Sequence, residues 1–362
     1  MRAGRFSSFP GSRVDLGVVG ERSLAGITES CQRPHLPSRQ RGSIGVVTPT
    51  TMAAGDPLVL VNPRASGMID PIRRERILAA TKAAVRSRTG RDPIVEAGSL
   101  AAMRATLATA RDAALVVVVG GDGSVREAAN AMANGDAPLA IIPAGTGNVL
   151  AGSLGIRGLG PALDAIRSGR PRRLDLGRAR WGSTSGSRGT NEAAAERIFI
   201  VACGMGLDAR IMAAAETEWK RRLRFGAYVG AAVRELGRLQ PSRFRIVADG
   251  DAMEIDGYLA MVANAGQLVP GRIGPRQPID PSSGRLELIV LGGRDPLAAL
   301  HGAARLLLGT GELYGGVIRR SVSKVTIQSD PEQPIETDGD HHRAGILDVE
   351  VLPGAVSVLV PR

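Results

Sequence analysis

The sequence predicts an α/β protein, in which a doubly wound nucleotide-binding domain is followed by a mainly β second domain. Two observations lead to this prediction. Between residues 57 and 143, short apolar runs alternate with helical stretches, which is the pattern of a parallel sheet covered by helices on both faces. After about Asp175, strand-like segments separated by turns dominate instead. A chain of 362 residues is long enough for two domains.

The elements of the first half follow from apolar runs and helical periodicity. The continuous apolar run Leu115–Val119 is typical of a parallel strand that is buried on both faces, and a helix should begin near Val125. The other expected strands are 58–61, 94–95 and 139–143, and the other expected helices are about 73–88 and 100–110.

The second half contains more strands than helices. Residues 180–197 have the composition of a surface loop, and residues 218–239 form a basic amphipathic pattern that predicts one inserted helix. This helix could lie on a membrane surface or pack its apolar face against the β domain. The expected strands are 198–202, 244–248, 258–263, 286–291, 322–328 and 356–360.

Composition shifts divide the chain into three parts. Residues 1–54 are rich in Gly, Ser, Pro and Arg without periodicity, which predicts a disordered extension; Met52 is an alternative start of translation. Residues 55–175 are expected to form the α/β domain and residues 176–362 the second domain.

The bulk composition narrows the class of protein. No apolar run approaches the roughly 20 residues of a membrane span, and the N-terminus lacks a secretory h-region. Two cysteines, Cys31 and Cys203, indicate a reducing compartment, so we expect a cytoplasmic protein.

The formal charge of +11 favours an anionic partner. Aromatic residues make up only 3%, which argues against nucleic acid and for nucleotide phosphate or an anionic lipid surface. A merely solvated arginine-rich surface is the alternative for part of this charge.

Three glycine-rich turns each follow an apolar strand of the first half. They read NPRASG at 62–67, GGDG at 120–123 and PAGTGN at 143–148. Glycine lets backbone N–H groups approach a ligand closely, and a turn at a helix N-terminus attracts phosphate. Strand ends in an open α/β sheet meet at one edge, so together the turns predict a polyphosphate site. Any one of them alone would be an ordinary tight turn. Neither a Walker nor a Rossmann glycine motif is present,.

In this order, NPRASG, GGDGSVREAAN and PAGTGNVLA resemble the diacylglycerol kinase catalytic family, which includes soluble bacterial lipid kinases and sphingosine kinases. The resemblance continues with LDLGR at 174–178, GMGLDARI at 204–211, the basic helix, TDGD at 337–340 and the closing LPGAVSVLVP. It covers about residues 57–362.

The resemblance implies a fold and an activity. The second domain should be a mainly antiparallel β-sandwich, with the active site in the cleft between the domains and the C-terminal strand returning toward the first. The activity should be transfer of the γ-phosphate of ATP, with Mg²⁺, to a lipid hydroxyl such as that of diacylglycerol. The enzyme should act at an anionic membrane surface as a peripheral protein, and a homodimer is left open.

The resemblance also assigns roles to residues. Asp122 should serve Mg²⁺ and the phosphates, and Asp338 should be the general base. Glu127, Asn130 and Asp340 should support the site. The expected ATP-binding residues are Asn62, Gly67, Gly121, Gly123, Thr146, Gly147 and Asn148.

The chain departs from the family pattern at two places. Asp340 stands where the family has Glu, which puts its role in doubt more than that of Asp338. Ser283-Gly284 replaces an Asp-Gly that many bacterial members use near a structural metal, so that metal is not predicted. His341 and His342 are expected to be exposed loop residues rather than metal ligands.

Two other functions are also compatible with the sequence. An NAD kinase or a phosphofructokinase also uses a GGDG turn, and a catalytically silent homologue could bind nucleotide or lipid as a sensor. PAGTGN and TDGD favour the lipid kinase. The sequence does not distinguish diacylglycerol from a sphingoid base, a glycolipid or an isoprenoid alcohol as acceptor.

Overall fold

A computed structural model describes residues 53–182, 195–206, 241–266, 278–295, 298 and 316–362. Nearly all of the expected N-terminal extension and the whole of the basic segment 218–239 lie outside the described residues. All described residues belong to one compact unit, Pro49–Arg362.

A parallel four-stranded sheet forms the centre of the first part of the chain, in the order β4-β3-β1-β2. Its strands are β1 (Pro57–Val61), β2 (Ile94–Ala97), β3 (Leu115–Gly120) and β4 (Leu139–Pro143). Every residue of β1 and β3 is buried, as expected of strands that are covered on both faces. These strands agree with the sequence prediction to within two residues.

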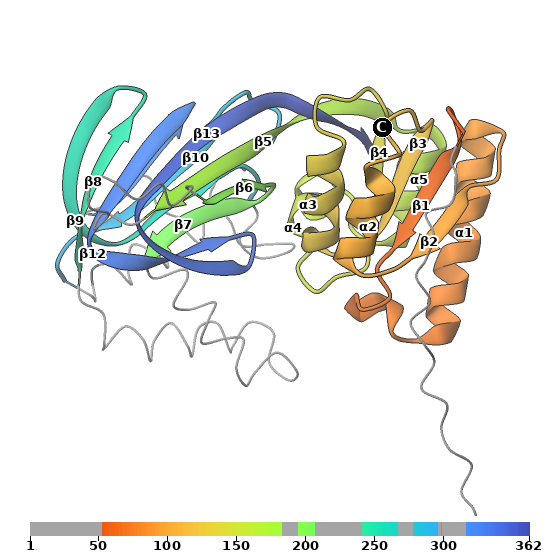
Figure 1. Ribbon diagram of the computed structural model, residues 1–362, viewed down its shortest axis with the longest axis horizontal. Helices are drawn as coiled ribbons and strands as arrows, with labels where there is room; N and C mark the ends of the chain where they lie inside the picture. Colours follow the sequence, from red (N-terminus) through yellow and green to blue (C-terminus); the bar gives the residue numbers. More distant parts are fainter. Residues whose placement is uncertain (1–52, 183–194, 207–240, 267–277, 296–297, 299–315) are drawn as a thin grey trace, which may run out of the picture. The chain divides into compact units, whose positions relative to one another are not determined.

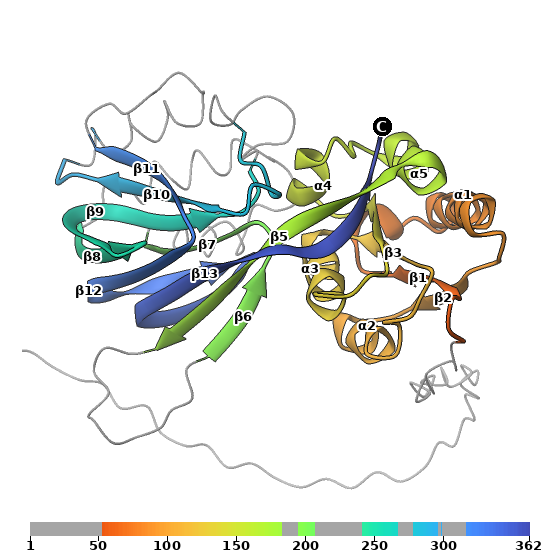
Figure 2. The same cartoon turned by 90° about the horizontal axis from the view of Figure 1, so that it is seen from above.

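Helices cover both faces of this sheet. Helices α1 and α5 lie on one face, and α2 and α3 lie on the other (Figures 1 and 2). Asp70 caps α1 by accepting the N–H groups of Ile72 and Arg73, and Gly90 ends it with φ 71°,. The helices are η1 (Ser66–Met68), α1 (Pro71–Thr89), α2 (Leu100–Leu107), α3 (Asp122–Ala131), α4 (Val149–Ser153) and α5 (Leu159–Ser168).

Helix α3 begins earlier than the sequence suggested. The prediction placed its start near Val125, but the helix begins at Asp122 because the N–H groups of Ser124 and Val125 both bond to the carbonyl of Gly121. The glycine-rich turn is therefore already the first helical turn. The whole of GGDG lies at the point where β3 passes into α3.

The later part of the chain is mainly antiparallel β-structure. Every described strand pair within it is antiparallel, and a second apolar core contains the buried Phe199, Phe244 and Leu347. The strands are β5 (Arg170–Gly182), β6 (Ala195–Phe199), β7 (Ala202–Gly206), β8 (Ser242–Ala248), β9 (Asp251–Ala263), β10 (Leu286–Gly292), β11 (Val317–Val322), β12 (Lys324–Thr337) and β13 (Asp340–Val360).

Several expected strands of the second half were wrong in their bounds. The expected strand 198–202 spans the end of β6, the break at residues 200–201 and the start of β7, and here the backbone turns its N–H groups toward Asp338. The expected strand 322–328 is divided at Ser323 between β11 and β12. Strand β13 is far longer than the expected 356–360, because His341 and His342, which were expected in a loop, pair with β12, and the strand continues past an irregularity between Leu352 and Val356.

The two long strands β5 and β13 continue from one part of the chain into the other. They pair antiparallel along most of their length (Figure 1), and Val358 of β13 pairs in parallel with Leu139 of β4. The described strands therefore form one continuous hydrogen-bonded sheet. This continuity connects the α/β part directly to the antiparallel part.

Candidate active site

The three glycine-rich turns meet at one edge of the parallel sheet. The N–H of Gly67 donates to the carbonyl of Ala144 at 2.8 Å, and Asn62 donates through Nδ2 to Ser124 Oγ at 2.9 Å. A Cβ on Gly121 would lie 3.0 Å from the Cα of Gly145, so these two turns touch backbone to backbone. The predicted convergence of the turns is present in the structure.

The third turn holds its own shape. Asn148 has φ 52°, and its side chain accepts the N–H of Gly145 at 2.9 Å and donates to the carbonyl of Gly145 at 2.7 Å. Thr146 and Gly147 are exposed on the turn, and Thr146 Oγ1 donates to Ser66 Oγ at 3.4 Å. Asn148 therefore orders the turn, while Thr146 and Gly147 present their polar groups outward.

Asp122 connects the second turn to the third. Its Oδ2 accepts the N–H of Val149 at 3.1 Å, and its Oδ1 accepts the N–H of Leu150 at 3.3 Å, so it caps the short helix α4. Burial raises its pKa, although these backbone N–H groups oppose the shift. A Cβ on Gly147 would lie 2.9 Å from Oδ2, which explains why glycine stands there.

The surroundings of Asp122 fit one mode of Mg²⁺ binding. The described residues contain no group of three acidic, His or Cys side chains that could enclose a metal. Magnesium is commonly held by one or two carboxylates together with substrate phosphates. Each oxygen of Asp122 accepts one of the two backbone hydrogen bonds, so a further lone pair on each remains for a cation that a nucleotide brings with it.

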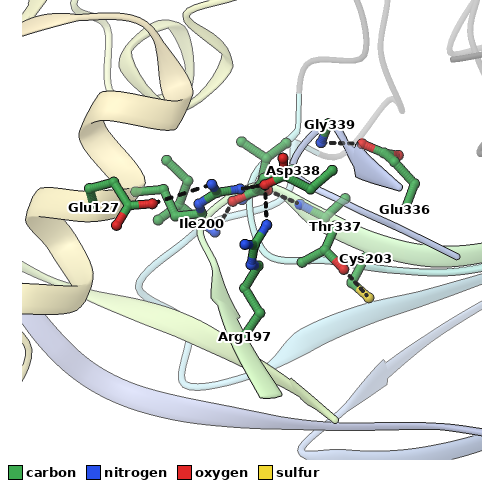
Figure 3. A network of polar contacts seen from close by, with 12 residues as sticks. Glu127, Arg197, Ile200, Cys203, Glu336, Thr337, Asp338 and Gly339 are labelled. Atoms are coloured by element: carbon green, nitrogen blue, oxygen red, sulfur yellow. Dashed lines mark hydrogen bonds and ion pairs between the residues drawn. The ribbon is translucent and has the colours of Figure 1, made fainter. Parts of the chain in front are cut away.

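Asp338 lies in the turn between β12 and β13, where it has φ 46°. Its carboxylate accepts three backbone N–H groups, from Ile200 at 2.8 Å, Val201 at 3.0 Å and Ala202 at 3.1 Å (Figure 3). Burial raises its pKa to about 6, against the opposing effects of these N–H groups and of Arg126. A carboxylate with such a pKa can accept and release a proton near neutral pH.

A chain of charged side chains connects α3 to this turn. Arg126 Nη1 lies 2.7 Å from Asp340 Oδ2, and Arg197 pairs with the same carboxylate. On the other side, Glu127 lies 3.4 Å from Arg126 and accepts from Arg104 Nη2 at 2.8 Å. Burial raises the pKa of Glu127, but the hydrogen bond from Arg104 and the two arginine charges outweigh it and hold the pKa below its usual value.

The sequence predicted some members of this row of charged side chains. It placed Glu127 and Asp340 in a supporting role but named neither Arg126 nor Arg197. The spacing of Arg126 four residues after Asp122 was an available signal, because such residues share one face of a helix. Asn130, also expected to support the site, has an exposed side chain and takes no part in the interactions of these described residues.

The two adjacent histidines are not exposed loop residues, and that prediction was wrong. His341 and His342 lie in β13 and are partly buried. The ring of His342 stacks on Trp181 with the centroids 4.4 Å apart. Burial and the neighbouring charge of Arg197 lower the pKa of His342. The stacked imidazole is therefore part of the packing beside Asp340.

Two family models match the chain. The model of the diacylglycerol kinase catalytic domain matches residues 56–179, and the model of the YegS C-terminal NAD kinase beta sandwich-like domain matches residues 201–360.

Curated proteins and a solved structure agree with this assignment. A diacylglycerol kinase from Mycobacterium tuberculosis (strain ATCC 25618 / H37Rv) is 30% identical over 261 residues, which cover 70% of this chain and 79% of that protein. A Pseudomonas putida protein named "Probable lipid kinase YegS-like" is 26% identical over 250 residues, covering 68% and 77%. The crystal structure of a diacylglycerol kinase from Bacillus anthracis str. Sterne superposes with a TM-score of 0.61 at 18% identity, covering 86% and 98%; at this identity the likeness concerns the fold.

The chain belongs to the diacylglycerol kinase catalytic-domain family, and it has the two-domain architecture of that family: an α/β domain followed by a mostly antiparallel β-rich domain. No described helix combines the length and the apolar composition that crossing a bilayer requires.

Proposed function

We propose that this protein is an ATP-dependent lipid kinase that transfers the γ-phosphate of ATP to the hydroxyl of a membrane lipid such as diacylglycerol. Membership of a kinase family supports the reaction type. The proposed use of ATP and of a lipid hydroxyl is supported by two groups of residues, the three turns at the sheet edge and the carboxylate of Asp338.

The three turns form the nucleotide half of the proposed site. The first turn of α3 has no side-chain cap, and helix N-termini attract phosphate through their unpaired N–H groups and dipole. When bound, Mg²⁺ would neutralise phosphate charge, and Asp122 would hold it. The proposed nucleotide-binding residues are Asn62, Gly67, Gly121, Gly123, Thr146, Gly147 and Asn148.

Asp338 forms the acceptor half of the proposed site. Its carboxylate would take the proton of the lipid hydroxyl while the lipid oxygen bonds to the γ-phosphorus. The bond between that phosphorus and the β,γ-bridging oxygen breaks at the same time, and ADP leaves with the electron pair. With a pKa of about 6, Asp338 is mostly ionised at neutral pH and is a stronger base than an ordinary aspartate.

One observation carries the proposal. Arg126 lies on the helix that starts at Asp122, and it pairs at 2.7 Å with Asp340, two residues beyond Asp338. The helix that opens the nucleotide half therefore contacts the turn that carries the proposed base. Phosphoryl transfer depends on positioning and on charge stabilisation, and such a link would serve both.

The experiment is a transfer assay with γ-labelled ATP and a panel of acceptors. Diacylglycerol, a sphingoid base, a glycolipid and an isoprenoid alcohol would be presented in mixed micelles, and NAD in solution. Label in one lipid and not in NAD supports the proposal and names the acceptor. Label in NAD alone would establish the small-molecule kinase instead, and ATP binding without any transfer would indicate a silent homologue.

A further inference from the structure

We infer that the start of helix α1, with the turn before it, is a surface that docks on an anionic bilayer. This docking surface consists of Arg64 and residues Ile69–Arg76. The inference rests on the proposed function in one respect: a lipid kinase must reach its acceptor in a bilayer. The residues that support the inference are not the proposed catalytic residues.

Two isoleucines stand exposed on this surface. Ile69 is 68% exposed and Ile72 is 65% exposed, and Val247 at 44% is the remaining exposed large apolar residue among those the structure describes. Single exposed apolar residues are ordinary. Here, however, two of them stand only three positions apart in the sequence, on either side of the N-cap of one helix.

The backbone beneath these isoleucines is fixed. Asp70 caps α1 through two hydrogen bonds at 2.9 and 3.1 Å, Pro71 occupies the first helical position, and Met68 is fully buried beneath the segment. The two isoleucines are therefore presented by a capped helix start that is anchored in the core. Their exposure does not result from a fraying helix end.

The charges around the isoleucines are mostly positive and unpaired. The surface carries four arginines, and none of them forms an ion pair with another described residue. Farther along the same helix, by contrast, Arg86 pairs with Asp92 at 3.5 Å. The segment contains two acidic residues, Asp70 and Glu75. Asp70 already accepts two backbone N–H groups, so Glu75 is the acidic side chain that remains to offset the positive charge. The four arginines are Arg64, Arg73, Arg74 and Arg76.

The docking surface adjoins the nucleotide turns. It follows directly after NPRASG, where Gly67 N–H donates to the carbonyl of Ala144 and Ser66 lies 3.4 Å from Thr146. A bilayer in contact with Ile69 and Ile72 would therefore lie next to the edge of the sheet where phosphate is proposed to bind. Docking there would bring a bilayer-embedded acceptor toward that edge.

An anionic bilayer satisfies both kinds of side chain at once. Apolar groups can enter the boundary between headgroups and acyl chains while arginines contact anionic headgroups just above it. A nucleic acid would pair with the arginines but would leave the isoleucines in water. The combination of an apolar pair with unpaired cations therefore favours the lipid surface.

The test is sedimentation of the full-length protein with vesicles. Pure phosphatidylcholine would be compared with a mixture of phosphatidylcholine and phosphatidylglycerol. Replacing both isoleucines (I69N with I72N) should weaken binding to the mixed vesicles by roughly tenfold or more, since each buried methylene contributes about 0.8 kcal/mol. Replacing two arginines (R73Q with R76Q) should weaken it by about 30-fold at low salt, at about 1 kcal/mol per charge. The matched control is V247N, which also replaces an exposed apolar residue but on β8 and should bind as the wild type does.

The outcomes separate this inference from the proposed function. Wild-type binding by the double isoleucine variant, or failure of the wild type to bind the mixed vesicles, overturns the docking surface even if a lipid is phosphorylated. If the double isoleucine variant loses vesicle binding but turns over a water-soluble short-chain diacylglycerol as the wild type does, the result supports the docking surface. If no lipid is phosphorylated yet binding still depends on the isoleucines, the docking surface stands and the proposed kinase activity fails.

Discussion

Arg126 and Asp340 form an ion pair with an Nη1–Oδ2 distance of 2.7 Å, although one lies on α3 and the other begins β13. The arginine side chain is only 7% exposed, whereas that of the aspartate is 43% exposed. A buried guanidinium is costly to hold without partners, and Arg126 has Glu127 on its other side. This pair is a direct contact between the helix at the phosphate turns and the turn that carries Asp338.

Replacing Arg126 by Met should impair catalysis and change its pH dependence. The charge of Arg126 lowers the pKa of Asp338, so its removal raises that pKa and moves the acid limb of the pH–rate profile to higher pH. Loss of the contact with Asp340 should also reduce turnover at neutral pH by roughly 10- to 100-fold through misplacement of the base. The measurement is kcat/KM across pH.

Arg104→Met is the control for this variant. Arg104 pairs with Glu127 from the exposed end of the same chain of charges, so its loss should leave the acid limb in place. An Arg126→Met enzyme with the wild-type pH profile would contradict the positioning role.

The free energy of unfolding should depend on pH because the pKa of Asp338 is raised in the folded protein. The pKa is about 6 in the folded protein and about 3.9 in an unfolded chain, so the folded state binds more protons between these values. The contribution of Asp338 to stability is therefore complete below about pH 4 and is lost as pH rises through about 6.

Asp338→Asn removes this titration. The free energy of unfolding of the wild type relative to the variant should fall by about 2 kcal/mol between about pH 4.5 and pH 7.5, as measured by denaturant unfolding at both pH values. A difference that stays constant over this interval would mean that Asp338 titrates normally.

Two glycines of the phosphate turns should respond differently to a methyl group. At Gly145 an added Cβ would collide with the backbone of Gly121, whereas at Gly123 it would meet nothing within 4 Å. Gly145→Ala should therefore lower the melting temperature. Gly123→Ala should keep or raise it, since alanine is favoured over glycine in a helix by up to about 1 kcal/mol.

Nucleotide binding distinguishes a ligand site from a purely structural turn. If phosphate approaches the backbone at Gly123, Gly123→Ala should weaken ATP binding in calorimetry despite its intact fold. Wild-type ATP affinity in this variant would remove Gly123 from the proposed site.

Asp122 has two roles that two substitutions separate. Asp122→Ala should lose both the cap of α4, at about 0.5–2 kcal/mol, and the carboxylate charge. Asp122→Asn keeps an oxygen that can accept a backbone N–H but loses the charge that Mg²⁺ requires. Because its amide nitrogen would face one of the two backbone N–H groups, Asn should restore only part of the melting temperature lost in Asp122→Ala, while transfer stays lower by several orders of magnitude. Full activity in Asp122→Asn would reduce Asp122 to a structural cap.

Local signals were sufficient to predict the parallel strands and the glycine-rich turns of the α/β half, but not helices α4 and α5. Continuous apolar runs such as Leu115–Val119 and the glycine-rich turns after them depend on neighbouring residues alone, and the structure has these strands and turns nearly as expected. The start of α3 was misjudged because glycines usually break helices, whereas here Gly121 accepts the first helical bonds.

The contacts of the site depend on topology that the sequence pattern does not carry. Asp122 was expected to face a metal, but its role as the cap of α4 requires the third turn to lie against the second. The three N–H donors of Asp338 come from a break between β6 and β7 that apolar periodicity suggested was a strand. Arg126 pairs with Asp340 because the turn between β12 and β13 lies against α3.

The most direct test of the account is transfer of γ-phosphate by Asp338→Asn. Asparagine keeps the shape of the side chain but cannot take the hydroxyl proton, so turnover with the lipid acceptor should fall by roughly 10²–10⁴-fold, while ATP binding, measured separately, is unchanged. Wild-type turnover in this variant, with Asp122→Ala inactive, would contradict the assignment of Asp338 as the base and would move that role to Asp122.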